Sequence, residues 1–274
     1  MVEGMAGRVP YLLGVSLKPE RAASDYPFNL PVVRSLNLQF NSTVTFFVGE
    51  NGTGKSTVIE ALAAVCRLPV SGGSRNELSA NHGPDAESSL APALRPAFRR
   101  RPPDGYFLRA EFQAHLASLL DARKLDPDFL GDPYAAYGGR SLHTRSHGEA
   151  FLAILKNRIR SGLFLFDEPE SALSPQRQLS LLTHMSALVA SGKAQFIVAT
   201  HSPILLTFPD AQILSFDGDV VRQISLEETS HYQITRGILQ NPAVYWKHLR
   251  APVDEQRTGT GRTTARGVRP RRRD

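Results

Sequence analysis

The segment from Gly49 to Thr57, GENGTGKST, fits the pattern G-x-x-x-x-G-K-[ST]. The apolar run VTFFV before it predicts a strand, and the segment STVIEALAAVCRL after it has apolar residues at helical spacing. Glycines let the backbone turn tightly and bring bare N–H groups against phosphate oxygens, and the helix start adds a partial positive charge. A strand, this loop and a helix in this order predict a phosphate-binding loop.

The loop also predicts roles for its side chains. Lys55 is expected to reach the β- and γ-phosphates of a nucleotide, and Ser56 to hold Mg²⁺. The alternative is a glycine-rich turn without a ligand, and the flanking strand and helix favour nucleotide binding. The predicted nucleotide-binding residues of the loop are Gly49, Glu50, Asn51, Gly52, Thr53, Gly54, Lys55, Ser56 and Thr57.

A second apolar run, LFLFDEPE, ends in two carboxylates, Asp167 and Glu168. Ligands of open α/β sheets bind at the carboxyl ends of strands, where this run would deliver both groups. Asp167 is expected to coordinate Mg²⁺, directly or through water, and Glu168 to act as general base on the attacking water. The alternative is a turn or a helix cap, which the phosphate loop upstream disfavours.

A histidine follows a later apolar run, IVATHSP, 33 residues after Glu168. From the end of a strand, His201 can donate to the γ-phosphate and hold the water in line. With Glu168 and Lys55 it completes the predicted catalytic set. The alternative is an ordinary loop histidine.

Alternating strand and helix patterns predict an α/β fold with a mostly parallel sheet flanked by helices. Residues 32–49 are expected to form two strands around Asn41-Ser42, and residues 71–105 a loop. Ser174 is expected to cap a helix over 175–191. The other expected elements are a strand running into a helix over 106–124, a helix over 147–160, and strands over 163–169, 194–200 and 211–218.

Charge is unevenly distributed along the chain of 274 residues. Residues 257–274 hold seven arginines and one aspartate, and without them the +6 net charge falls to zero. We expect residues 1–250 to form one domain and 251–274 a disordered tail, because the tail has too few apolar residues to order itself. Such a tail suits nucleic acid or acidic lipid, or serves only to solubilise. The triplet Arg99–Arg101 is expected to be a solvated charge run.

The chain has one cysteine, Cys66, set among apolar residues and expected to be a small buried side chain. The N-terminus lacks the pattern of a secretory signal, and the chain contains no apolar run long enough to span a membrane. These features predict a cytoplasmic protein.

The stretch RSHGEAFLAIL predicts a helix that starts with a capping box, in which Ser146 and Glu149 satisfy each other's backbone N–H groups. A glycine-containing helix start is also an anion site, so the structural role does not exclude a functional one. A metal at His147 is not expected, because no Cys/His cluster surrounds it.

Phosphate loop, Ser-His-Gly-Glu, Asp-Glu strand and histidine follow in an order that resembles the ABC-type ATPase superfamily. Ser146 lies 21 residues before Asp167, as in the family's signature spacing, and SALS (171–174) stands where the family has its D-loop. The resemblance covers roughly residues 10–216. GGRSLHTRSHGEAF and YPFNLPVVR further resemble small stand-alone bacterial ATPases of the AAA or ABC kind.

The resemblance implies an ABC-type ATPase head, with an N-terminal antiparallel β part and a reduced irregular or helical insertion at about 70–145. It also implies that Ser146 and Gly148 contact the γ-phosphate bound to the other protomer. The family's usual signature has Gly where His147 stands here. Gln113 or Glu111 would be the glutamine-loop residue.

Tyr26 or Phe28 would stack on adenine, and either would equally suit the core. We therefore expect a soluble ATPase that binds and hydrolyses ATP with Mg²⁺, closes as an ATP-sandwich homodimer, and drives or gates an unidentified partner, in DNA handling or defence. The alternative is the nucleotide-binding subunit of an ABC membrane transporter. A chromosome-maintenance ATPase would carry long heptad helices, which are missing, and a P-loop kinase would not explain the signature spacing or His201.

Overall fold

The computed structural model describes residues 9–19, 25–74, 88–109 and 112–250. Its central sheet has seven strands in the order β10-β9-β3-β8-β7-β6-β4. The strands are β3 (Val44–Val48), β4 (Gly73–Ser74), β6 (Gly105–Arg109), β7 (Gly162–Asp167), β8 (Ala194–Ala199), β9 (Gln212–Ser215) and β10 (Arg222–Ile224). Strands β9, β3, β8, β7 and β6 run parallel, and β10 and β4 add antiparallel edges. The predicted mostly parallel α/β sheet is confirmed.

The middle strands are mostly apolar because both faces of the sheet are covered. Val44, Phe46 and Val48 of β3 belong to the core on one face, whereas Phe47 belongs to the core on the other. This alternation follows from the two-residue period of a strand.

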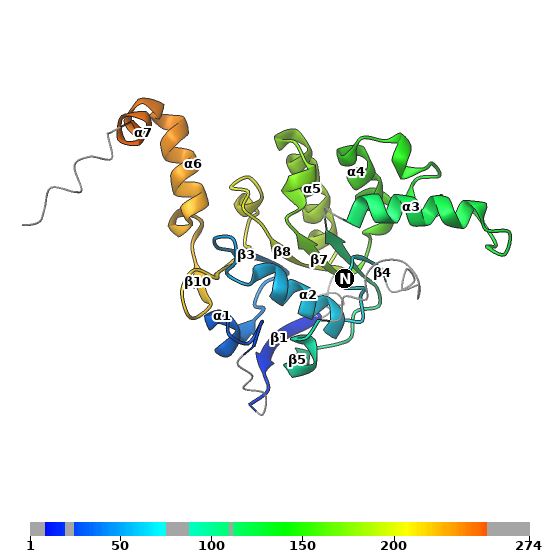
Figure 1. Ribbon diagram of the computed structural model, residues 1–274, viewed down its shortest axis with the longest axis horizontal. Coiled ribbons are helices and arrows are strands. Elements are labelled where there is room, and N and C mark those ends of the chain that lie inside the picture. The colour runs from blue at the N-terminus through cyan, green and yellow to red at the C-terminus, as the bar shows by residue number, and fades with distance from the viewer. Residues whose placement is uncertain (1–8, 20–24, 75–87, 110–111, 251–274) are drawn as a thin grey trace, which may run out of the picture. The chain divides into compact units, whose positions relative to one another are not determined.

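Helices cover both faces (Figure 1). Helix α2 (Lys55–Val65) packs on one face, and α3 (Phe112–Leu125), α4 (His147–Arg158) and α5 (Pro175–Ala190) lie on the other. Ser174 precedes α5 as expected, but its side chain makes no capping hydrogen bond. Pro175 stands in the first turn, where its missing N–H costs nothing.

A second, antiparallel sheet confirms the N-terminal β part. Strand β1 (Leu12–Leu17) lies between β2 (Asn37–Gln39) and β5 (Leu94–Phe98). Gln195 of β8, fully buried, binds this sheet to the main one: its Oε1 accepts from the N–H groups of Tyr11 and Leu12, and its Nε2 donates to Leu12 O.

Two local predictions were wrong. Residues Pro31–Arg34 form a short helix, α1, rather than a strand, because Pro31 fixes a helical φ at the first position and Val32 and Val33 turn inward. The strand β5 was missed because Pro96 argues against a central strand. Its only strand partner among the described residues is β1, so it is an edge strand, where proline is tolerated.

The chain divides into two compact units, Met1–Gln233 and Ile234–Asp274. Helix α6 (Ser230–Gln240) begins in the first unit, and α7 (Pro242–Leu249) lies in the second. The arginine-rich tail at 257–274 falls outside the described residues, as does Glu111. In the part of the chain that is described, no helix is long and apolar enough to cross a membrane.

The part of the predicted insertion that is described after α3 is irregular, as expected, with short 3-10 turns at Ala135–Tyr137 and Leu142–Thr144. Side chains hold it together: the hydroxyls of Tyr134 and Ser141 both donate to Asp121 Oδ1, at 2.6 and 2.9 Å. Those two hydrogen bonds lower the pKa of Asp121.

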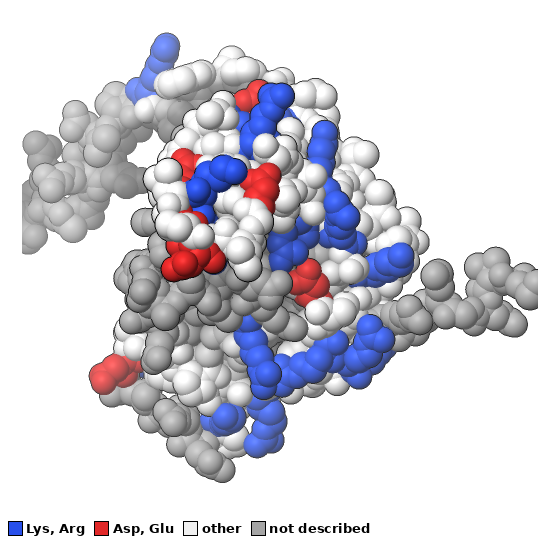
Figure 2. Space-filling model, turned by 90° about the vertical axis from the view of Figure 1, so that its right-hand side faces the viewer, with Lys and Arg blue, Asp and Glu red and all other residues white. Residues whose placement is uncertain are grey.

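Basic side chains lie on the surface, and Figure 2 shows a face on which Lys and Arg outnumber Asp and Glu. The triplet Arg99–Arg101 is exposed as expected. It also contacts aromatic rings of the antiparallel part, with the Arg101 guanidinium 4.2 Å from the Phe98 ring centre. Cys66 is buried, as predicted.

Candidate active site

The loop after β3 has the backbone that a phosphate loop needs. Gly49 and Gly54 have φ of 145° and 98°, which side chains rarely adopt. A Cβ on Gly54 would also lie 3.2 Å from Leu30 Cδ1. Asp217, which follows β9, fixes the loop from outside, since its Oδ1 accepts from Glu50 N at 2.9 Å.

Lys55 opens helix α2 with its ammonium folded back into the loop. Its Nζ donates to Gly49 O at 2.6 Å and to Glu50 O at 2.8 Å, and only 4% of the residue is exposed. Burial lowers the pKa of Lys55, and nearby carboxylates, Glu168 first, oppose that shift. A phosphate anion at this loop would stabilise the ammonium further.

Ser56 and Asp167, the two predicted metal ligands, lie together. Ser56 Oγ donates to Asp167 Oδ1 at 3.1 Å. Asp167 is 7% exposed, and burial raises its pKa to about 6, although Arg109 opposes the shift. Arg109, at the end of β6, lies 3.8 Å from Asp167 Oδ2 and pairs with Glu60 of α2 at 2.7 Å.

Glu168 follows β7 directly and has an unusual backbone. Its φ of 49° and ψ of 54° are left-handed, a strained conformation for a residue with a side chain. Three hydrogen bonds hold its backbone: Glu168 N donates to Ala199 O, and Ser171 donates to Glu168 O from both its backbone N and its Oγ. The side chain remains 43% exposed and lines a pocket with Lys55 and Ser56.

His201 follows β8, which lies between β3 and β7, and its Nε2 is 3.4 Å from Glu168 Oε1. The loop that carries His201 is fixed by Glu170, whose Oε1 accepts from His201 N at 2.6 Å. Burial raises the pKa of Glu170. On its other side, His201 Nδ1 lies 2.7 Å from Nε2 of His231, in the first turn of α6.

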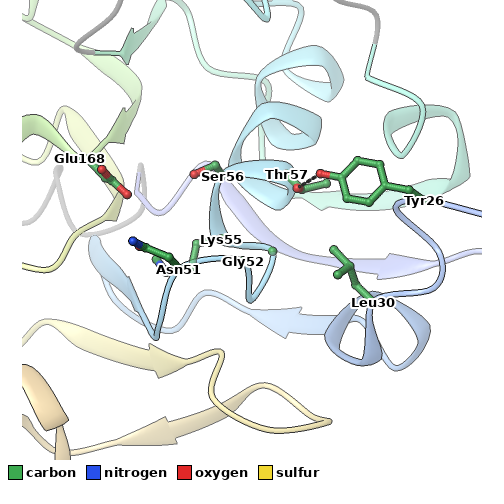
Figure 3. A pocket seen from close by; sticks show the side chains of 9 residues that line it. Tyr26, Leu30, Asn51, Gly52, Lys55, Ser56, Thr57 and Glu168 are labelled. Atoms are coloured by element: carbon green, nitrogen blue, oxygen red, sulfur yellow. Dashed lines mark hydrogen bonds between the residues drawn. The ribbon is translucent and has the colours of Figure 1, made fainter.

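The phosphate loop, Glu168, Tyr26 and Leu30 line a pocket of about 260 Å³ (Figure 3). Glu168 stands on one side and Tyr26 with Leu30 on the other, with the phosphate loop between them. Tyr26 is 66% exposed, and its hydroxyl lies 2.8 Å from Thr57 Oγ1. Phe28, the other predicted base-stacking residue, packs partly buried against the core under α2.

Ser146 and Gly148, the predicted signature residues, do not line this pocket of their own chain. The capping box is present, with Ser146 N and Oγ each 2.8 Å from Glu149 Oε2 and Glu149 N donating to Ser146 Oγ. These hydrogen bonds lower the pKa of Glu149. Arg177 of α5 covers Gly148, where any Cβ would collide with the guanidinium.

The sequence reasoning missed four residues of this site: Arg109, Glu170, Asp217 and His231. Glu170 had a local signal, as the second glutamate of DEPE two residues after Glu168. The other three come from distant segments with no motif. Of the two predicted glutamine-loop residues, Gln113 lies in α3, and Glu111 is outside the described residues.

Comparisons with known proteins agree with this geometry. Two family models match, "AAA domain, putative AbiEii toxin, Type IV TA system" over residues 149–207 and "AAA domain" over residues 28–92. The first covers the strand with Asp167 and Glu168, and the second covers the phosphate loop. The resemblance to AAA/ABC-type P-loop ATPases is confirmed, and with it ATP hydrolase activity.

Individual relatives are distant. The chain is 26% identical over 259 residues to the lactose transport ATP-binding protein LacK of Rhizobium radiobacter, covering 88% of this chain and 69% of that protein. It is 24% identical over 179 residues to the translation initiation factor RLI1 of Saccharomyces cerevisiae, covering 65% of this chain but only 28% of that protein. The ADP conformation of MJ1267, an ATP-binding cassette of an ABC transporter, superposes with a TM-score of 0.48 at 14% identity, over 88% of this chain and 100% of that one.

Proposed function

We propose that this chain, a P-loop ATPase of the AAA/ABC type, binds ATP with Mg²⁺ in the pocket at the carboxyl ends of β3, β7 and β8. We further propose that it hydrolyses ATP as a sandwich of two copies to drive or gate a partner protein. One observation carries the catalytic part: His201 Nε2 lies 3.4 Å from Glu168 Oε1, beside a phosphate loop whose Lys55 lines the same pocket as Glu168.

Each group has a part suited to its position. The N–H groups of the loop and the Lys55 ammonium hold the phosphates. The half-exposed Glu168 carboxylate takes the proton of the attacking water, and His201 donates to the γ-phosphate and fixes the water between them. Tyr26, rather than the partly buried Phe28, stacks on the base, because its ring is exposed at the far end of the pocket.

Ser56 and Asp167 suit Mg²⁺, which prefers oxygen ligands. The fit is supported by the raised pKa of Asp167, about 6, which marks a buried carboxylate with too little positive charge near it. When bound, the ion would neutralise charge on the phosphates. Ser56 and Asp167 would hold it, and Arg109 would keep Asp167 oriented.

The second copy would supply what the pocket lacks. Ser146 and Gly148 do not line the pocket of their own chain, yet they start a helix whose N–H groups and partial positive charge suit a phosphate. We propose that they contact the γ-phosphate of the partner protomer.

ATP turnover and solution mass test this function together. Wild-type protein with ATP and Mg²⁺ should release phosphate. Glu168→Gln should bind ATP but release phosphate at least about 100-fold more slowly than wild type, and it should accumulate as a dimer. Wild-type rates in Glu168→Gln would refute the base, and a monomer under those conditions would refute the sandwich.

Two partners remain candidates. The description of the family model over residues 149–207, a putative toxin system, supports a defence partner. The similarity to a transport ATP-binding protein over 88% of the chain supports a membrane permease instead. Stimulation of turnover by DNA would favour the first, and stimulation only by a co-expressed membrane protein would favour the second.

A further inference from the structure

His231 makes the closest side-chain contact to His201. Its Nε2 lies 2.7 Å from His201 Nδ1, and the two rings meet edge to face with centres 4.8 Å apart. Both residues belong to the first compact unit, which ends at Gln233. The contact therefore joins the first turn of α6 to the end of β8 within one unit.

The contact limits which ring nitrogen of each histidine can carry a proton, because one of the two facing nitrogens must donate and the other must accept. His201 Nε2 faces Glu168 Oε1 at 3.4 Å, and an ionised carboxylate only accepts. The 3.4 Å contact is not a hydrogen bond, but the negative charge of the carboxylate favours a proton on His201 Nε2, which leaves Nδ1 as the acceptor. Nε2 of His231 must then be the donor of the 2.7 Å hydrogen bond.

The surroundings keep His231 neutral, as this assignment requires. Burial lowers the pKa of His231, and His201 and Lys55 lower it further, whereas Glu50 and Asp217 oppose them. A neutral imidazole has a single N–H, and His231 uses it toward His201. Nε2 of His201, which faces Glu168, is buried and has no hydrogen-bond partner among the described residues.

We propose that His231 is a positioning residue that donates from Nε2 to His201 Nδ1 and so holds His201 in the tautomer whose Nε2–H faces Glu168 and the γ-phosphate. This inference rests on the proposed role of His201. Glu170 fixes the backbone of His201, and His231 fixes its ring, so both the position and the proton are set before ATP arrives.

Two substitutions separate the donor from the bulk of the side chain. His231→Leu removes the donor, and His231→Gln keeps an N–H donor on a side chain of similar reach. Gln233→Ala is the matched control, because Gln233 lies on the same turn of α6 but donates to Glu227 O. Thermal unfolding and nucleotide affinity check that each variant is folded and that the Lys55 loop is intact.

The rate of ATP turnover should differ between His231→Leu and His231→Gln. We expect His231→Leu to lower kcat about tenfold with the KM for ATP changed by less than about twofold, since only the orientation of a catalytic group is lost. His231→Gln should retain kcat within about threefold, and Gln233→Ala should match wild type. Equal kcat in wild type and His231→Leu, or an equal loss in Leu and Gln variants, would overturn the proposal.

Nitrogen NMR of the full chain gives a readout that needs no turnover. Ring ¹⁵N shifts of His201, assigned with His201→Gln, should show a protonated Nε2 and an unprotonated Nδ1 in wild type, and mixed tautomers in His231→Leu. A proton on Nδ1 of wild-type His201 would refute the inference even in an active enzyme. If wild-type protein shows the predicted tautomer but hydrolyses no ATP, the proposed function fails and the hydrogen bond stands.

Discussion

The hydroxyl of Ser56 donates a hydrogen bond to Asp167 Oδ1 over 3.1 Å, although 111 residues separate them in the sequence. The bond connects the first turn of α2 to the carboxyl end of β7. One hydroxyl and the guanidinium of Arg109 at 3.8 Å do not offset the burial of Asp167, whose pKa is raised to about 6. The burial of this carboxylate therefore costs stability, as expected if Asp167 has the proposed role of Mg²⁺ ligand.

That cost predicts how stability changes with pH. The folded-state pKa of Asp167, about 6, lies above the ordinary value of 3.8, so the folded protein holds this proton more tightly. The contribution of protonated Asp167 to the free energy of unfolding is complete below about pH 4 and lost as the pH rises through about 6, by roughly 3 kcal/mol at most.

Asp167→Asn should remove this dependence. Without Mg²⁺ or nucleotide, the variant should gain stability relative to wild type as the pH is raised from 4 to 7, measured by urea unfolding at each pH. Asp219→Asn, at an exposed position, is the control and should leave the pH profile unchanged. Parallel wild-type and Asp167→Asn profiles would contradict the assignment.

Lys55→Ala should weaken ATP binding. Its Nζ lies in the loop on Gly49 O and Glu50 O, where it would turn to the phosphates. Losing charge-assisted hydrogen bonds of about 1.5–3 kcal/mol should raise the Kd about 10- to 100-fold, measured by calorimetry. Lys18→Ala is the control, because Lys18, the residue after β1, also donates to a carbonyl, Pro92 O. A similar loss in both variants would point to folding rather than phosphate contact.

Ser146 separates a helix cap from a contact between protomers. Ser146→Ala should cost about 1 kcal/mol of stability, measured by urea unfolding, because Glu149 N loses its acceptor. If the cap is its only role, turnover per folded molecule should be unchanged. Combined with Glu168→Gln, Ser146→Arg should bind ATP in its own pocket and fail to dimerise, whereas Ser180→Arg, on the exposed surface of α5, should dimerise.

Mixing two inactive variants tests the same proposed contact between Ser146 and the partner protomer's nucleotide. Lys55→Ala and Ser146→Arg chains should each be inactive alone. A mixed dimer keeps one composite site, with Lys55 from one chain and Ser146 from the other, so partial turnover on mixing is expected. Normal ATP-driven dimerisation of Ser146→Arg would leave Ser146 as a cap only.

The aromatic ring of Tyr26, rather than its hydroxyl, should contribute to ATP binding. Stacking of a base on an aromatic side chain is worth about 1–3 kcal/mol, so Tyr26→Ala should weaken ATP binding about 5- to 100-fold. Tyr26→Phe loses only the contact with Thr57 Oγ1 and should bind nearly as wild type. Fluorescence titration with ATP and with inorganic triphosphate checks this, because triphosphate has no base and should bind both variants alike.

Local sequence patterns predicted most of the parallel sheet and its helices, because the spacing of apolar residues and the residue types of a loop can be recognised within a short stretch of sequence. The capping box of Ser146 and Glu149 formed as predicted for the same reason. Prediction failed at two prolines, because proline is compatible with more than one local structure. Pro96 is typical of a loop but lies on an edge strand, and Pro31 starts a short helix before an apolar run that was predicted to be a strand.

The sequence by itself determined the phosphate loop, the Asp167-Glu168 strand end and His201, since each is a residue type at a fixed place after an apolar run. Only the tertiary structure decided which of these residues lie close to one another and which other residues they contact. The strand order β3-β8-β7 set His201 between the loop and Glu168, and the folding of distant segments added Arg109, Asp217 and His231. Such contacts depend on which strands pair and where a later helix begins, and no periodicity within a short window of sequence encodes that choice.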